Sequence, residues 1–330
     1  MSLLVSTEID YLDAHGNSDV VPVYKKLLSE VQDKRDPTTG KLLHPWKFEV
    51  VPGFFKQSDV ATNDLKFNYA TEDFGRTSSW AELISKLDGL NREAGPDESY
   101  KLLFLARHGQ GFHNQIVEKY GIDAWNEKWY GLTTDGEVTY APDPMLTELG
   151  INQAKENNAA WKEQVAQGCP IPSKFYVSPL QRSCHTLVHT WNGIKSQDVQ
   201  PLVIESVRET IGRNLCDKRS TRTVIKERFG KENFIIDESV TENDELFRDD
   251  WRESISEQGI RCNGFLQYLF DKEWESSAVD KTKAIKDSVI NVTSHAGTIR
   301  AFLTVIAHRE FAISTGGMIP VVVKGTRKID

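Results

Sequence analysis

Residues 100–114 read YKLLFLARHGQGFHN, and this stretch decides how the rest of the chain is interpreted. Its first part, residues 100–106, is a nearly continuous apolar run, as expected of a β-strand that is covered on both faces of its sheet. Its second part, residues 107–114, is polar and rich in glycine, which is typical of a loop. We therefore expect a buried strand whose carboxyl end carries polar side chains.

Further strand patterns follow this strand and alternate with helical ones. Strands are predicted at residues 174–177, 200–205, 288–293 and 318–324, the last of which would close the sheet, and helices at residues 147–167, 180–192 and 298–308. Residues 205–275 are expected to be mostly helical, with core candidates Trp251, Ile255, Phe265, Leu266, Leu269 and Phe270. Strands that alternate with helices predict an α/β protein, built as a three-layer α/β/α sandwich.

The first 99 residues carry weaker patterns. We expect a helix over residues 20–32, a short strand within residues 48–55 and a helix over residues 79–90, followed by a polar connector at residues 91–99. Residues 1–99 are interpreted as an N-terminal extension that packs on a main domain of residues 100–330, because Trp46, Phe54, Phe55 and Trp80 need burial.

Composition limits the possible partners and location. The 330 residues carry 40 Lys plus Arg against 48 Asp plus Glu, a net charge of −8. This balance favours neither nucleic acid nor an anionic membrane surface. The four cysteines form no C-x-x-C motif, and neither a secretory signal nor an apolar run of membrane-spanning length is present. We expect a cytoplasmic protein and make no prediction of its oligomeric state.

Charged and polar side chains gather where the predicted strands end. The first strand ends in Arg107 and His108, and the second is followed by Arg182. Glu209 follows the third strand and His295 the fourth. Ligands of such sheets bind beyond the carboxyl ends of the strands, so we expect these five side chains to meet there.

Together these residue types suit phosphoryl transfer. Arg107 and Arg182 would hold the phosphate through forked donors, and neutral His108 would attack phosphorus. His295 would stabilise charge on the transferred group, and Glu209 would protonate the leaving alkoxide. The arginines neutralise the phosphate, so no cofactor or divalent metal is expected. Gly109 and Gly111 are expected to let the backbone approach the ligand closely.

Four ordered motifs resemble the histidine phosphatase superfamily, in its phosphoglycerate-mutase-like branch, over roughly residues 100–313. They are RHG at 107–109, SPLxR at 178–182, RE at 208–209 and SHAG at 294–297. The resemblance implies a sandwich with a mixed, mostly parallel sheet, and a catalytic domain over residues 100–330. It further implies that His108 is phosphorylated, that Glu209 is the proton donor, and that the following residues contact phosphate or substrate: Arg107, Arg182, His295, Asn114, Gly109 and Gly297.

Departures from the family pattern narrow the resemblance. Gly111 and His113 stand where the acid-phosphatase branch has its Arg and Pro, and Gly111 also differs from the Ser or Thr of typical mutases. Residues 110–114, and residues 210–212 together with 216–220, instead resemble the phosphomutase-like proteins of fungi and plants. Arg213 and Arg219 would extend the anion site or would be solvated loop charges, and His113 would contact substrate or be structural.

The loop at residues 120–144 follows the first motif and is aromatic. Its Trp125, Trp129 and Tyr130 would cover the leaving group or, as we favour, form an ordinary core cluster.

The leading hypothesis is a metal-independent phosphomonoesterase that acts on a small-molecule phosphate ester. One alternative is a phosphomutase, which needs a second basic subsite, for which Arg213, Lys218 and Arg219 are the clustered candidates. Another alternative is a protein that binds phosphorylated ligands without catalysis. The sequence argues against this alternative, because a chemically competent residue fills every catalytic position.

Overall fold

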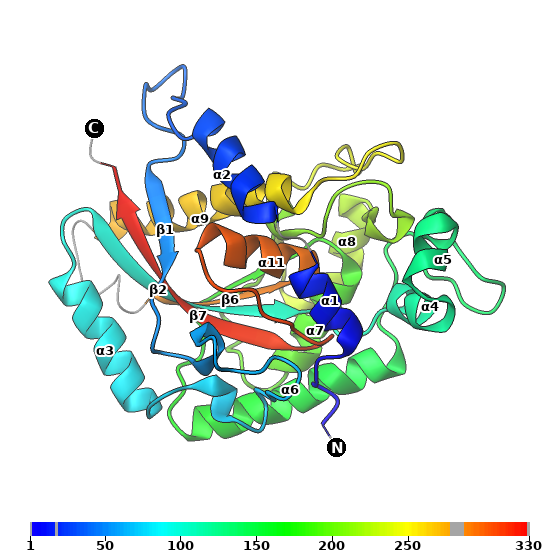
Figure 1. The fold of residues 1–330 in the computed structure, drawn as a ribbon, viewed down its shortest axis with the longest axis horizontal. Helices are drawn as coiled ribbons and strands as arrows, with labels where there is room; N and C mark the ends of the chain where they lie inside the picture. Colours follow the sequence, from blue (N-terminus) through cyan, green and yellow to red (C-terminus); the bar gives the residue numbers. More distant parts are fainter. Residues whose placement is uncertain (1, 17–18, 278–286, 329–330) are drawn as a thin grey trace.

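The computed structural model describes residues 2–16, 19–277 and 287–328 (Figure 1). Its α-helices are α1 Glu8–His15, α2 Val20–Val31, α3 Trp80–Glu93, α4 Phe112–Tyr120, α5 Ile122–Glu127, α6 Glu148–Ala166, α7 Gln181–Trp191, α8 Arg222–Phe229, α9 Ile255–Ser277 and α11 Ala296–Val305. Its strands are β1 Trp46–Val50, β2 Glu98–Arg107, β3 Lys174–Val177, β4 Leu202–Val203, β5 Ile235–Ile236, β6 Val289–Ser294 and β7 Met318–Arg327.

The described strands form one 7-stranded sheet in the order β1-β7-β2-β6-β3-β4-β5. Strands β2, β6, β3, β4 and β5 pair in parallel, whereas β7 runs antiparallel to both β1 and β2. The predicted mixed, mostly parallel sheet is therefore confirmed. The prediction that the last strand closes the sheet is wrong, because β7 lies inside it with β1 at the edge.

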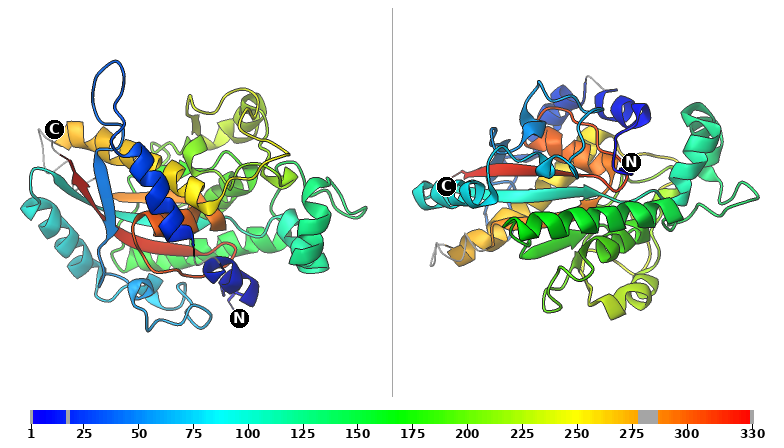
Figure 2. Two further views of the ribbon diagram at one scale, coloured as in Figure 1. Left: turned by 45° about the horizontal axis from the view of Figure 1, so that its top comes forward. Right: turned by 90° about the horizontal axis from the view of Figure 1, so that it is seen from below.

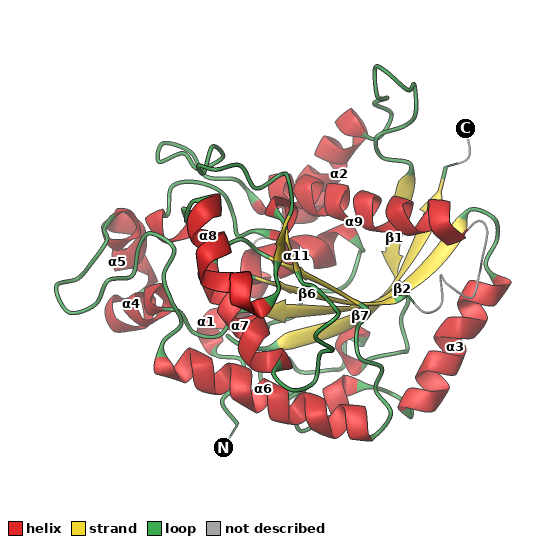
Figure 3. Cartoon of the chain, turned by 180° about the vertical axis from the view of Figure 1, so that it is seen from behind, coloured by secondary structure: helices red, strands yellow, loops and turns green. Residues whose placement is uncertain are grey.

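Helices cover both faces of this sheet, which confirms the three-layer sandwich (Figure 3). Helix α11 packs against α9, and α2 packs against both. Helices α6 and α7 pack together, and α6 lies on the side of the sheet opposite α2 and α11 (Figure 2, right). Strand β2 is thus enclosed, and residues 100–106 are all buried, as their apolar sequence predicts.

The register of the parallel strands brings the predicted motifs together. Arg107 pairs with Ser294 across β2 and β6, and the His108 backbone N–H donates to the Ser294 carbonyl at 3.0 Å. On the other side of β6, the Ser178 N–H donates to the Thr293 carbonyl at 3.1 Å. Three motifs far apart in sequence therefore end at one edge of the sheet.

Residues 205–254 differ from the sequence prediction. Only α8 forms an α-helix in this stretch, and the rest is irregular with short 3-10 turns. Buried ion pairs organise it instead: Arg208 pairs with Glu205 and Asp244, and Arg219 pairs with Glu205. Such pairing does not follow helical periodicity, so the periodic pattern was misleading here.

The predicted core of the 205–275 segment is mostly correct. Phe265, Leu266, Leu269 and Phe270 on α9 are buried, and Ile255 packs against the core while partly buried. Trp251, in contrast, is 37% exposed, because it precedes α9 and lies in the irregular stretch rather than on a packed helix face.

The N-terminal residues share the core of the sheet. Trp46, Phe54, Phe55 and Trp80 are buried in the same apolar cluster as Phe104 of β2. Ser79 caps the predicted helix α3, accepting a hydrogen bond from the backbone of the third helical residue. The boundary at residue 99 stays a prediction.

All four cysteines are free and buried. None of the described helices is long and apolar enough to cross a membrane.

Candidate active site

A cavity of about 530 Å³, here called the strand-end cavity, opens at the carboxyl ends of β2 and β6. Five of the predicted site residues line it: Arg107, His113, Asn114, Glu209 and Gly297. The other three charged or imidazole side chains, His108, Arg182 and His295, are almost fully buried next to it. The structure therefore brings the predicted catalytic and phosphate-binding residues to one place.

His108 follows β2 directly, and its ring is held in one orientation. Its Nδ1 lies 2.7 Å from the carbonyl oxygen of Gly109, which assigns the proton to Nδ1 and leaves the lone pair on Nε2. Burial, together with the charges of Arg182 and Arg107, holds the pKa of His108 well below its usual range. The imidazole is therefore neutral, which is the form that can act as a nucleophile.

Arg182 lies in the first turn of α7 and is completely buried. Its Nη2 donates to Asp217 at 2.8 Å and its Nη1 donates to the Cys216 carbonyl at 3.0 Å. Its Nε lies 3.4 Å from Nε2 of His108. Arg182 is thus fixed by two acceptors while one N–H points at the nucleophilic nitrogen.

His295 precedes α11, and its ring is edge-on to that of His108 with centroids 4.9 Å apart. Its Nε2 lies 2.7 Å from the Ser178 hydroxyl, whereas its buried Nδ1 has no hydrogen-bond partner. Burial and the Arg182 charge lower the pKa of His295 well below its usual range. A buried N–H without an acceptor is costly, so Nδ1 is suited to an oxygen atom of a ligand.

Glu209 lies beside this nitrogen, with Oε2 3.8 Å from Nδ1 of His295. Its Oε1 accepts hydrogen bonds from the backbone and the hydroxyl of Thr210, at 2.8 and 3.1 Å. Burial and the nearby Asp217 charge raise the pKa of Glu209. The carboxyl group therefore keeps a proton at a higher pH than an exposed glutamate does.

Gly297 makes room for this carboxyl group. A Cβ atom at Gly297 would lie 2.6 Å from Oε1 of Glu209 and 2.8 Å from the hydroxyl of Thr210. The predicted importance of Gly297 thus has a steric explanation on the Glu209 side of the cavity.

The glycines of the first motif serve the fold as well. A Cβ at Gly109 would lie 2.3 Å from the Gly150 carbonyl oxygen, and a Cβ at Gly111 would lie 2.8 Å from the His113 ring. Each of these two glycines therefore permits a close approach to another part of the chain, and their predicted approach to a ligand stays a prediction. Asn114 also has a local contact, since its Oδ1 accepts from the Gly111 N–H at 2.9 Å.

His113 takes part in the site. Its ring centroid is 5.6 Å from that of His108, and its buried Nδ1 has no partner. Burial and the Arg182 charge lower the pKa of His113 well below its usual range, so it adds a neutral hydrogen-bonding group and no charge.

Comparison with known proteins identifies the family of the chain. The sequence profile of the histidine phosphatase superfamily (branch 1) matches residues 103–315. The chain belongs to this superfamily.

Relatives of this histidine phosphatase superfamily member occur in fungi. It is 34% identical over 296 residues to a probable phosphoglycerate mutase of Arthroderma benhamiae, with 84% of each chain covered. It is 32% identical over 279 residues to phosphomutase-like protein 3 of Candida albicans, covering 84% of this chain and 80% of the relative. The phosphoglycerate mutase structure from Bacillus anthracis aligns with 13% identity and a TM-score of 0.42, over 69% and 89% of the two chains.

These comparisons confirm the predicted family and its phosphoglycerate-mutase-like character. The chain is an enzyme of phosphatase or mutase type.

The proposed extension of the anion site has other contacts in the histidine phosphatase. Arg213 donates to the Asn126 carbonyl at 2.8 Å and lies over the Tyr130 ring, whereas Arg219 is buried against Glu205. Lys218 lies over the Phe247 ring. None of the three cations lines the strand-end cavity, so they do not form the second basic subsite that a mutase would need there.

Two other arginines, which the sequence did not single out, line the strand-end cavity of the histidine phosphatase. Arg252 donates to Asp217 at 3.2 Å, and Arg300 donates to Asp13 of α1 at 2.9 Å. Arg300 lies on α11, five residues after His295, a spacing that does not place the two on one helix face and so gave no signal. Arg252 lies in the irregular stretch, where no pattern indicates it.

The aromatic loop residues mainly pack against one another. Trp125 belongs to a second apolar cluster with Ile116 and Tyr140, and Trp129 stacks on Tyr120. Trp125 also lines the strand-end cavity. The favoured interpretation of these residues as a core cluster thus holds. Trp125 contributes both to that cluster and to the wall of the strand-end cavity.

Proposed function

We propose that the chain is a metal-independent phosphomonoesterase that forms a phosphohistidine on His108, with Glu209 as proton donor. The observation that carries the proposal is the buried imidazole of His108, held at Nδ1 by the Gly109 carbonyl and facing Arg182 Nε with Nε2, in one group with the Glu209 carboxyl, whose pKa is raised. These are the nucleophile and the acid that the reaction requires.

In the first step, Nε2 of His108 attacks phosphorus, the bond from phosphorus to the ester oxygen breaks, and Glu209 gives its proton to the leaving alkoxide. In the second step, water attacks the phosphoryl group, Glu209 takes a proton from that water, and the P–N bond breaks. Inorganic phosphate leaves, and His108 and Glu209 return to their starting states. The overall reaction consumes one water for each ester.

Charge on the transferred phosphoryl group is met by the side chains around His108. Arg182 Nε, at 3.4 Å from Nε2, lies within reach of an oxygen on the phosphohistidine. Nδ1 of His295 has no hydrogen-bond partner, and a phosphoryl oxygen would serve as its acceptor. Arg107 adds a fixed positive charge at the cavity wall. Because these groups neutralise the dianion, the proposal needs no metal ion.

A phosphomutase is the second candidate. It is favoured by the fungal relative that bears the name of a probable phosphoglycerate mutase, and by Arg252 and Arg300 on the cavity wall. A screen of sugar phosphates, nucleotides and phosphoglycerates, with phosphate release and isomerisation measured together, separates the two. Release without isomerisation supports the phosphomonoesterase.

The nucleophile is tested directly by His108→Ala. We expect phosphate release to be abolished, together with the acid-labile phosphoenzyme that rapid quenching traps in the unmodified protein. Full activity of His108→Ala would show that the nucleophile is assigned wrongly.

We also propose a cytoplasmic location, since four free cysteines suit a reducing compartment.

A further inference from the structure

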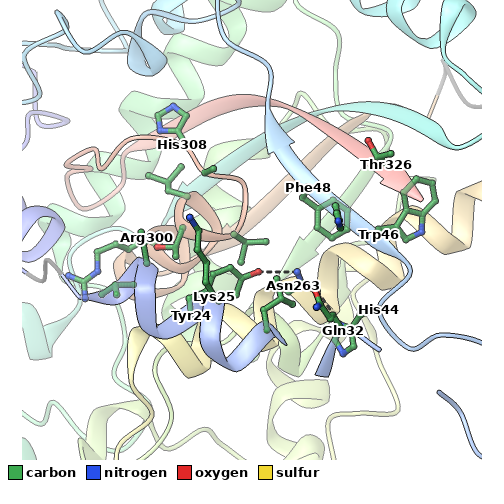
Figure 4. Close-up of a pocket in the computed structure, with 18 of the residues that line it drawn as sticks. Tyr24, Lys25, Gln32, His44, Trp46, Phe48, Asn263, Arg300, His308 and Thr326 are labelled. Atoms are coloured by element: carbon green, nitrogen blue, oxygen red, sulfur yellow. Dashed lines mark hydrogen bonds between the residues drawn. The ribbon is translucent and has the colours of Figure 1, made fainter. Parts of the chain in front are cut away.

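A larger cavity lies beneath helix α2, apart from the candidate active site. It has a volume of about 810 Å³ and is called the α2 cavity here. Helices α9 and α11, strand β1 and the end of β7 complete its walls (Figure 4). The side chains that the proposed reaction uses, His108, Arg182, Glu209 and His295, do not line it. Sites for small molecules commonly have volumes of about 300 to 1,000 Å³, so this cavity has room for a ligand of its own.

The buried part of the wall is apolar. Leu303 and Val305 of α11 and Trp46 and Phe48 of β1 are buried core residues that line the cavity, and Leu28 of α2 lines it while partly buried. These side chains offer few polar partners, which an ordered water needs. Placing apolar groups of a ligand against them removes apolar surface from water and is favourable. This part of the α2 cavity therefore suits an apolar molecule.

One hydrogen-bond donor is left over beside these apolar side chains. Nδ2 of Asn263 on α9 donates to the buried Tyr24 hydroxyl at 3.0 Å (Figure 4), while Oδ1 of Asn263 accepts from Gln267 at 3.0 Å. The amide nitrogen can only donate, so the hydroxyl oxygen is the acceptor and its own proton is not used in this bond. No described residue accepts that proton. Burial raises the pKa of Tyr24 to about 12, so the hydroxyl stays protonated at neutral pH and can donate to a ligand.

The wall of the α2 cavity also carries positive charge that its own acids do not neutralise. Lys25 of α2 and Lys47 of β1 line the cavity, and neither has an ion-pair or hydrogen-bond partner in the described part of the chain. The two acids of the wall, Asp33 and Glu310, already have partners, Lys328 at 3.0 Å and an imidazole of α1 at 3.2 Å. This wall therefore attracts a negative group rather than a positive one.

We propose that the α2 cavity binds an amphipathic carboxylate, a molecule with an apolar chain or ring system and one carboxylate. Its apolar part lies against Leu28 and Val305, and its carboxylate accepts from the Tyr24 hydroxyl and pairs with Lys25. Figure 4 shows the side chains of Tyr24 and Lys25 on the side of α2 that faces β1. A carboxylate fits this pair of donors because each of its two oxygens accepts hydrogen bonds. The site goes beyond the proposed function and does not depend on it.

The chemistry of the ligand is tested with three probes that share one apolar chain: decanoate, 1-decanol and decyltrimethylammonium. Binding to the full chain is measured by calorimetry, below the solubility or micelle limit of each probe. We expect saturable binding of decanoate at one site per chain. Since the probes differ in the head group, we expect the other two to bind at least about tenfold more weakly. No saturable binding of decanoate, or binding of decanol with equal affinity, would overturn the proposal.

The carboxylate contacts are tested with Tyr24→Phe and Lys25→Gln. The matched control is Lys26→Gln, because Lys26 is exposed on the same helix and does not line the cavity. We expect each of the first two to weaken decanoate binding at least about fivefold, and to change decanol binding less than about twofold. Urea unfolding curves show that each variant is folded. Equal losses for decanoate and decanol would refute the carboxylate contact, and an equal decanoate loss in Lys26→Gln would reduce it to general surface charge.

The location is tested with Leu28→Trp, which fills part of the cavity with a larger side chain. We expect decanoate to bind at least about tenfold more weakly, while hydrolysis of a phosphate ester continues at the rate of the unmodified protein. Unchanged decanoate binding by folded Leu28→Trp would place the probe elsewhere and refute the site. The results for Tyr24→Phe and Lys25→Gln decide the proposal if the tryptophan prevents folding.

Discussion

The substitution Glu209→Gln tests the chemistry most directly, because it removes a proton while preserving the shape of the site. A glutamine has nearly the same size, and its Oε1 can still accept from the Thr210 N–H that lies 2.8 Å from the carboxylate. On the Gly297 side the space is narrow, because even a Cβ atom at Gly297 would lie 2.6 Å from Oε1 of Glu209. The glutamine side chain therefore has little freedom to move toward Gly297. The variant therefore isolates the loss of the acidic proton.

The expected effect depends on the leaving group. An alkoxide is a poor leaving group without a proton, and general acid catalysis contributes roughly 10²- to 10⁴-fold to such steps. The loss for an alkyl phosphate corresponds to about 3 to 5 kcal/mol of activation free energy. A nitrophenolate leaves without protonation, so we expect its formation to slow by only a few fold. The ratio of the two losses is the quantity that matters.

The assay compares kcat/KM for glycerol 2-phosphate and 4-nitrophenyl phosphate, because kcat/KM reports the first step and excludes the hydrolysis of the phosphohistidine that both esters share; exposed Glu245→Gln is the control. In the unmodified protein, the alkyl ester rate should fall as pH rises through the raised pKa of Glu209, because the acid form is then lost. Glu209→Gln should lack this decline. Equal losses on both esters, or a decline that persists in the variant, would refute the assignment of Glu209 as the acid.

Four further outcomes are expected. Gly297→Ala should lower kcat for alkyl phosphates at least about tenfold, since its Cβ would lie 2.6 Å from Oε1 of Glu209; kcat equal to that of the unmodified protein would contradict this steric role. Arg208→Ala removes the ion-pair partner of the buried Asp244 carboxylate and should cost about 3 to 5 kcal/mol in the free energy of unfolding by urea. Arg248→Ala removes an exposed ion pair with Asp250 and should lower the free energy of unfolding by less than about 1 kcal/mol. Adding a chelator should leave phosphate release by the His108 reaction unchanged, and a sharp loss would rule out the metal-independent mechanism.

The sequence was most informative for residues whose place follows from the direction of the strand that they follow. His108 and His295 each follow an apolar run, and parallel strands with their ends in register bring such residues together. Ser79 and Thr147 were predictable as helix caps, because capping is a local interaction between a hydroxyl and the next backbone N–H groups. These features depend on a few neighbouring residues or on the order of strands.

Contacts between distant charged residues could not be predicted in this way. Arg219 resembled a loop cation, yet it is buried against Glu205, and Asp10 meets Arg107 from a helix that no motif indicated. Ion pairing has no period along the chain, so a charged residue gives the same local signal on the surface and in the core. Gly109 is a similar case, because only the fold shows that its missing side chain faces Gly150.

The charges of the site explain how an acidic protein can select an anion. His108, His113 and His295 are all held neutral by burial beside Arg182, since a second cation there would be repelled and poorly solvated. The positive charge that meets a phosphate is therefore carried by arginines, which do not lose their protons in the physiological range. The imidazoles are left free for hydrogen bonding and nucleophilic attack. The chain as a whole carries a net charge of −8, which disfavours large polyanions, while the arginines at the cavity attract a small anion.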